Sequence, residues 1–266
     1  MSIIRKGKFA PLLLFFMITC GGSARAGLTA DELEDSSDEQ GYEQLADHSS
    51  RYGNTARGRI QGPASRSSRY EIDNTAKGAY YLSETEREVI VEINLMRADP
   101  ARYAQKYLVP LRPYFQGNLL KYPGRVPIAT NEGIQALEEC IRELEHARPI
   151  SRLSPCKGLS LAARDHVQDQ ARTGATGHIG SDGSSMDARL NRYGRWDVSA
   201  AENISYGFND ARKIVTALLI DDGVQSRGHR KNLLNGSYRF VGVDIGPHRV
   251  YREMCVMDFA GEYSSN

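Results

Sequence analysis

Apolar side chains begin to recur at helical spacing just after residue 82. Ser83, with Glu86 three residues later, forms a capping box, and Pro100 stops the pattern, so a helix is expected between them. Between these limits, four residues follow the spacing of one helix face: Val89, Ile90, Ile93 and Met96.

Similar patterns predict further helices over residues 101–108, 131–146, 159–173 and 211–220. Four prolines make residues 110–130 an irregular loop, and residues 178–187 form a second, polar loop. Near the C-terminus, residues 240–245 and 250–259 are typical of strands, with 246–249 as their hairpin loop. Helices come first and strands last, which favours an α+β fold with helices packed on a small antiparallel sheet.

The N-terminus has the pattern of a secretory signal peptide over residues 1–26. Basic residues precede an apolar run from residue 9 to 19, and Ala24-Arg25-Ala26 is a small-x-small cleavage pattern. We therefore expect export, to an extracellular or periplasmic location. The alternative is a lipoprotein anchored through Cys20, although Thr19 fits a lipobox poorly.

Residues 27–80 contain few large aliphatic side chains and separate their charges. Eight acidic residues and no basic ones lie between Asp31 and Asp47, while five arginines and no acids lie between Arg51 and Arg69. Such a segment cannot bury enough apolar surface to offset its ordering entropy. We interpret 27–80 as a disordered, charge-segregated linker, and 81–266 as the folded domain.

Overall charge and composition exclude several classes of protein. The 266 residues hold 34 Lys+Arg against 33 Asp+Glu, without the basic excess expected of a nucleic-acid binder. No apolar run reaches 18 residues, so no transmembrane segment is expected. If Cys20 is removed, Cys140, Cys156 and Cys255 remain, and we expect one disulfide and one free thiol, with all three pairings open.

Four segments of the chain, in order, resemble the bacterial, SCP-like extracellular branch of the CAP superfamily. That superfamily includes cysteine-rich secretory proteins, insect antigen 5 and plant pathogenesis-related proteins of the first group. The resemblance rests on residues 92–97, on 177–194 with Gly177-His178, on Ala201-Glu202-Asn203-Ile204, and on 226–234 with Gly228-His229. It implies an α-β-α sandwich, in which residues 100–155 are an insertion with no assigned role.

The resemblance also implies a cleft with two histidines and two acids. By motif, these are His178, His229 and Glu202, with Asp222 favoured over its neighbour Asp221 as the second acid. Two imidazoles suit zinc or another divalent metal, and carboxylates can orient them or activate a bound water. Two protein ligands are fewer than a catalytic zinc site has, so we expect weak, exchangeable binding.

Three functions follow as competing hypotheses. The first is a binding module that holds a lipid, sterol-like molecule or peptide beside the metal-capable cleft. The second is a structural protein of the envelope or of host interaction, tethered by the linker. The third is a metal-dependent, peptidase-like hydrolase with Glu202 or Asp222 as general base. The sequence contains no established catalytic machinery and leaves the oligomeric state open.

Overall fold

The computed structural model of the chain describes residues 74–123 and 127–266. The expected signal peptide, Cys20 and the linker up to residue 73 lie outside these residues. Residues 74–80, assigned to the linker from composition, contact the domain through two buried alanines, Ala76 and Ala79. Ala76 is fully buried, and Thr75 donates a hydrogen bond of 2.8 Å to the backbone oxygen of Leu153. Small side chains fill the core here, which a count of large aliphatics overlooks.

Four strands form the central sheet in the order β4-β6-β7-β5, so β5 is an edge strand. The three long strands pair antiparallel, as expected, while the short β4 pairs parallel with β6. The strands are β4 (Ser154–Pro155), β5 (Gly194–Tyr206), β6 (Phe240–His248) and β7 (Arg252–Ser265).

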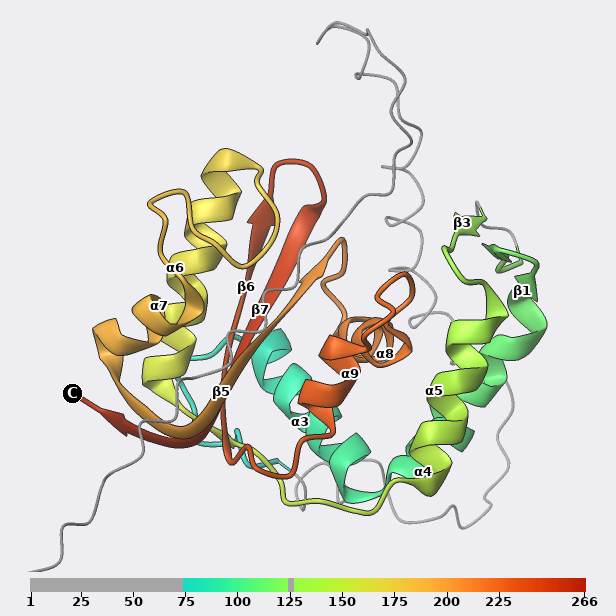
Figure 1. Cartoon of the computed structure of the whole chain (residues 1–266), viewed down its shortest axis with the longest axis horizontal. Helices are drawn as coiled ribbons and strands as arrows, with labels where there is room; N and C mark the ends of the chain where they lie inside the picture. Colours follow the sequence, from blue (N-terminus) through green and yellow to red (C-terminus); the bar gives the residue numbers. More distant parts are fainter. Residues whose placement is uncertain (1–73, 124–126) are drawn as a thin grey trace, which may run out of the picture. The chain divides into compact units, whose positions relative to one another are not determined.

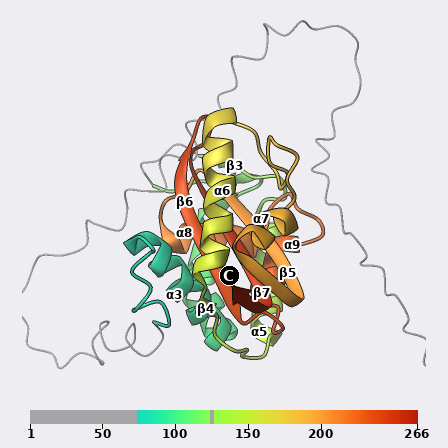
Figure 2. The same cartoon turned by 90° about the vertical axis from the view of Figure 1, so that its left-hand side faces the viewer.

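Helices α6 (Lys157–Thr173) and α7 (Met186–Tyr193) cover one face of the sheet, as Figure 1 and Figure 2 show. Helix α6 lies very close to β6. A Cβ atom at Gly242 would come within 2.1 Å of the backbone of Leu159 and Ser160, so only glycine permits this approach. The Ser160 hydroxyl accepts a hydrogen bond from the backbone N–H of Val243, which fixes helix and strand together.

The opposite face of the sheet is covered by α3 (Glu84–Ala98), α8 (Ala211–Ile220) and α9 (Gly228–Leu233). The expected insertion adds a further group of elements beyond them. These are α4 (Pro100–Tyr103), the π-helical η1 (Ala104–Leu108), the 3-10 helix η2 (Val109–Tyr114), β1 (Phe115–Gln116), β2 (Leu119–Leu120), β3 (Ile128–Ala129) and α5 (Ile134–His146). The largest apolar cluster joins α3, α5 and α8 to the sheet.

The predicted α+β class and three-layer arrangement are confirmed, and several boundaries differ. The strand β5 and the helices α7 and α9 were not expected. Strand β6 continues to His248, so the hairpin loop is shorter and later than 246–249. Residues 110–130 hold a short helix and small strands in place of a wholly irregular loop.

The first family-like segment, on α3, has a structural role. The Glu92 carboxylate accepts hydrogen bonds from Tyr103 and Arg212, at 2.8 Å each. Arg97 is fully buried and donates to four backbone oxygens: that of Ser151 after α5, that of Leu233 at the end of α9, and those of Asn235 and Tyr238 after α9. Burial lowers the pKa of Arg97 to about 10. These bonds fasten α3 to distant parts of the chain.

Cys140, Cys156 and Cys255 are all free thiols, so the expected disulfide is not formed among the described residues. They belong to separate elements, with Cys140 on α5, Cys156 at the start of α6 and Cys255 on β7. None of the described helices is both long and apolar enough to cross a bilayer.

Candidate functional site

His178 and Glu202 form the first of two histidine–acid pairs. His178 lies in the loop after α6, and Glu202 lies on the edge strand β5. The ring nitrogen Nδ1 of His178 is 2.8 Å from Oε1 of Glu202. The Glu202 side chain is 2% exposed and that of His178 is 42% exposed. The carboxylate is therefore held inside the fold, while the imidazole reaches solvent.

Arg189 on α7 holds the other oxygen of Glu202. One guanidinium nitrogen donates to Oε2 at 2.7 Å, and another donates to the backbone oxygen of His178 at 3.1 Å. Burial would raise the pKa of Glu202, but the hydrogen bond from His178 and the charge of Arg189 outweigh it and lower that pKa. Glu202 is thus a fixed carboxylate. The polar loop expected over residues 178–187 ends before Arg189, and no helix was expected at this position, so sequence reasoning gave Arg189 no role.

Asp258 on β7 lies directly opposite Glu202 in the sheet. Neither of its carboxyl oxygens has a hydrogen-bond partner within the described residues, and the side chain is fully buried. Burial and then the charge of Glu202 raise the pKa of Asp258 well above its usual range. The two neighbouring acids therefore separate into an ionised Glu202 and a neutral Asp258.

The second pair consists of His229 and Asp221. Asp221 ends α8 in the left-handed conformation, with φ of +56°. Its Oδ1 is 2.6 Å from Nδ1 of His229, and its Oδ2 accepts the backbone N–H of His229 at 3.0 Å. The Asp221 side chain is 2% exposed and the His229 side chain 24%.

Asp222, which sequence reasoning favoured as the second acid, points elsewhere. Its oxygens accept the backbone N–H groups of Asn131 and Glu132, at 2.7 and 2.8 Å. The structure therefore pairs His229 with Asp221, and Asp222 fastens the segment that precedes α5. The left-handed turn at Asp221 separates the directions of the two side chains.

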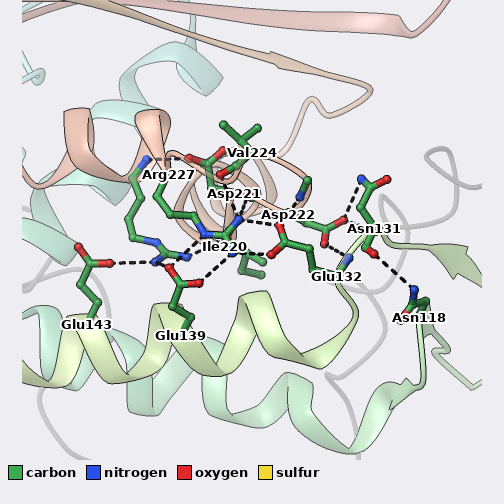
Figure 3. A network of polar contacts seen from close by, with 12 residues as sticks. Asn118, Asn131, Glu132, Glu139, Glu143, Ile220, Asp221, Asp222, Val224 and Arg227 are labelled. Atoms are coloured by element: carbon green, nitrogen blue, oxygen red, sulfur yellow. Dashed lines mark hydrogen bonds and ion pairs between the residues drawn. The ribbon is translucent and has the colours of Figure 1, made fainter. Parts of the chain in front are cut away.

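Side chains of the insertion bind the turn and the helix that carry the second pair. Figure 3 shows carboxylates from α5 and the segment before it reaching toward the turn after α8: Glu132, Glu139 and Glu143. Arg227 binds Glu132 and Glu139, at 2.6 and 2.8 Å. These hydrogen bonds lower the pKa of Glu139 to about 2.

Arg230 on α9 is fully buried at the centre of this network. It donates to the last carbonyls of α8, Leu219 at 2.6 Å and Ile220 at 2.9 Å. It also binds Glu139 and Glu143, at 2.9 and 2.8 Å. Arg230 thus ties α5 and α8 to the helix that carries His229.

Strand β5 connects the two pairs. Asn203, next to Glu202, donates to the backbone oxygen of His229 at 3.1 Å and accepts a hydrogen bond from Asn232 at 2.8 Å. On the side of the first pair, buried His166 lies 2.7 Å from the backbone oxygen of Gly177, which fixes the loop that carries His178. His166 is thus a packed residue of α6.

Both histidines are arranged in the same way. Each ring directs Nδ1 at a buried carboxylate, so the Nε2 lone pair is the one left for another partner. A carboxylate behind Nδ1 is the usual second partner of a metal-binding histidine. Among the described residues, however, no group of three or more His, Cys, Asp or Glu side chains is placed to hold a metal.

Two solved structures are similar to parts of this chain. No curated protein matches the chain. An extracellular protein containing an SCP domain from Bacillus anthracis strain Ames is 24% identical, with a TM-score of 0.35, over 45% of this chain and 36% of its own length. An outer surface protein from Borrelia burgdorferi is 17% identical, with a TM-score of 0.36, over 42% of this chain and 78% of its own.

A family model described as the cysteine-rich secretory protein family, CAP, matches residues 125–259. That match takes in both histidine–acid pairs, the edge strand β5 between them and both long strands of the β6–β7 hairpin up to Phe259. Because the match covers more than half of the chain, the chain belongs to the CAP family of cysteine-rich secretory proteins.

Proposed function

We propose that this CAP protein is an exported binding protein whose two histidine–acid pairs share one weakly held divalent cation, beside which a lipid- or peptide-like molecule binds. The observation that carries the proposal is the common orientation of His178 and His229, whose Nδ1 atoms are both engaged by buried carboxylates. Export is supported by the signal-peptide pattern of residues 1–26.

The donor set fits a labile metal better than a structural one. His178 and His229 would each supply Nε2, and Glu202 and Asp221 would orient the rings from behind. The described residues supply no third protein ligand, so water or the bound molecule would complete the coordination. When bound, the ion would polarise an oxygen of the molecule held there.

The chain's own residues prepare this site before any metal arrives. Arg189 balances the buried charge of Glu202, and the backbone N–H of His229 helps to balance that of Asp221. Asn203 donates a hydrogen bond to the backbone of His229 and is the sequence neighbour of Glu202. A displacement of one histidine–acid pair therefore displaces the other. This connection supports one shared site over two separate ones.

Zinc titration by calorimetry tests the metal part of the proposal. Wild-type exported chain should bind one ion, and either His178→Ala or His229→Ala should weaken binding at least tenfold. His146→Ala is the matched control, because that exposed histidine lies on α5 outside both pairs. Absence of binding would overturn the metal site, and two ions per chain, each lost with one histidine, would overturn the shared site.

Thermal unfolding tests the ligand part. Fatty acids, a sterol and short peptides would be added to the wild-type chain with zinc and with a chelator. A molecule that binds only the folded chain stabilises it by about 2.7 kcal/mol at a hundred times its Kd. At least one class should raise Tm, more with zinc present. A Tm that no class changes would overturn this part.

A further inference from the structure

His248 is the last residue of β6 and lies beneath the turn that joins β6 to β7. The residue is only 3% exposed, whereas Val250 and Tyr251 in the turn are 44% and 36% exposed. Figure 1 and Figure 2 show this turn beside the C-terminal end of α6. His248 belongs to neither histidine–acid pair, so its role follows from the contacts of its own ring.

Hydrogen bonds hold the His248 ring in one neutral form. Its Nδ1 accepts from the backbone N–H groups of Val250 and Tyr251, at 3.2 Å each. Because an amide N–H can only donate, Nδ1 has to carry a lone pair. Nε2 lies 3.0 Å from the backbone oxygen of Ala175, which can only accept, so Nε2 carries the hydrogen. The contacts therefore select the neutral tautomer with its hydrogen on Nε2.

The same ring joins the turn to the loop that carries His178. Ala175, which accepts from Nε2, lies three residues before His178 in that loop. The turn and the loop also approach each other directly, since a Cβ atom at Gly174 would lie 3.7 Å from a methyl carbon of Val250. His248 thus bonds to both segments where they meet.

Aromatic packing extends this junction to β5. The ring centroids of Tyr206 and Tyr251 both lie 5.2 Å from that of His248, and 5.2 Å from each other. The Tyr206 hydroxyl accepts the backbone N–H of Gly177, next to His178, at 3.0 Å. The position of the turn is therefore connected to the first histidine–acid pair through these rings.

The charged groups on the elements around the ring supply no counter-ion for an imidazolium. They are Asp169, Arg172, Arg249, Arg252, Glu253 and Glu202. The arginines are exposed and positive, and the two acids of α6 and β5 are held by other partners. Glu253 is paired in register with Pro247, one position before His248, so its side chain lies on the other face of the hairpin. Among the described residues, no carboxylate is hydrogen-bonded to His248.

A second proton on this ring is incompatible with the closed turn. It would place a donor at Nδ1, facing two backbone donors, and would bury a positive charge without a carboxylate partner. A histidine free in water takes up this proton near pH 6.5. Below about that pH the open form binds a proton that the closed form has no place for, so the closed turn loses stability as pH falls.

We propose that His248 is an acid-sensitive latch, whose neutral ring holds the β6–β7 turn against the loop that carries His178 and whose protonation on Nδ1 releases the turn. Release would separate Tyr251 from Tyr206 and free the loop at Ala175, on the side of the first histidine–acid pair. The latch itself requires no metal.

A titration of the full exported chain by nuclear magnetic resonance tests the latch, from about pH 7.5 to about pH 4.5. The His248 ring should be the Nε2–H tautomer at the start. The amide signals of Val250 and Tyr251 should then change with the same midpoint as the ring nitrogens, and their protection from hydrogen exchange should fall at least tenfold. An Nδ1–H tautomer, a ring that takes up no proton, or amides that do not follow the ring would overturn the proposal.

Variants separate His248 from other titrating groups. In His248→Asn, the amide oxygen takes about the position of Nδ1 and accepts from the turn without titrating in this range. The amides of Val250 and Tyr251 should therefore stay unchanged with pH. They would support the latch equally if they lay at their acid positions throughout, because the turn would then be open without the ring. A pH response like that of wild type would refute it. His146→Asn, on α5, is the matched control and should titrate as wild type.

Discussion

Replacing Arg230 by methionine tests whether the insertion and the His229 helix form one cooperative unit. The guanidinium is fully buried and satisfies two carbonyls at the end of α8, those of Leu219 and Ile220. Methionine fills much of the same space without donating a hydrogen bond. Both carbonyls would then lack their charged donor in the interior.

The magnitude follows from the exposure of each partner. A hydrogen bond to a charged group contributes about 1.5–3 kcal/mol, and two of them end on buried backbone oxygens. The side chains of Glu139 and Glu143 are 41% and 44% exposed, so water replaces Arg230 there at a cost below about 1 kcal/mol. We expect Arg230→Met to lower the free energy of unfolding by about 3–5 kcal/mol.

Equilibrium unfolding in urea, followed by circular dichroism, measures this loss. Glu143→Gln is the matched control, because its carboxylate contacts Arg230 alone in the network and is half exposed. It should cost less than about 1 kcal/mol. The reasoning would be refuted if Arg230→Met stayed within about 1 kcal/mol of wild type, or if Glu143→Gln were equally destabilising. Either result would mean that the buried carbonyls do not depend on the guanidinium.

Three further predictions concern the acids and the thiols. The Asp258→Asn variant should be more stable than wild type at neutral pH and similar to it below about pH 4. The reason is that the pKa of Asp258 is raised in the folded state, so the free energy of unfolding of the wild type falls as pH rises from about 3.9 toward the folded pKa. Equal pH profiles of the two proteins in urea unfolding would contradict this. Asp221→Asn should weaken zinc binding about 10- to 100-fold, whereas Asp222→Asn should lower Tm and leave zinc affinity unchanged. If calorimetry showed weaker zinc binding in Asp222→Asn and unchanged binding in Asp221→Asn, Asp222 would be the acid that supports His229. Iodoacetamide with mass spectrometry should label Cys156 ahead of the other two described cysteines, which are buried with raised thiol pKa and should react only in urea.

Elements with strong local signals could be predicted from the sequence. The capping box of α3 is present as expected, with Ser83 accepting from the N–H of Glu86 and Glu86 accepting from that of Ser83. Helix α8 begins and ends at the predicted residues, because Asp210 caps it and its apolar stripe is continuous. Local hydrogen bonds and periodicity suffice for such elements.

Strand β5 could not be predicted because its signals are not local. Its first half is largely exposed and its second half buried, as suits an edge strand that extends beyond the sheet. Its sequence mixes glycine, asparagine and charged residues, and it lacks regular alternation. Pairing with β7 along nearly its whole length makes it a strand. Helix α7, which leads directly into β5, was not predicted either, so the role of Arg189 on that helix was not recognised.

The choice between Asp221 and Asp222 shows where sequence reasoning about the site ended. Both acids follow α8, and spacing alone does not separate them. The separation comes from one backbone angle, φ of +56° at Asp221, which ends the helix and turns the two carboxylates to different partners. Arg227 then donates to the Asp221 carbonyl at 2.9 Å while it holds Glu132 and Glu139. The insertion, which had no role in the sequence reading, therefore fixes the turn that selects the partner of His229.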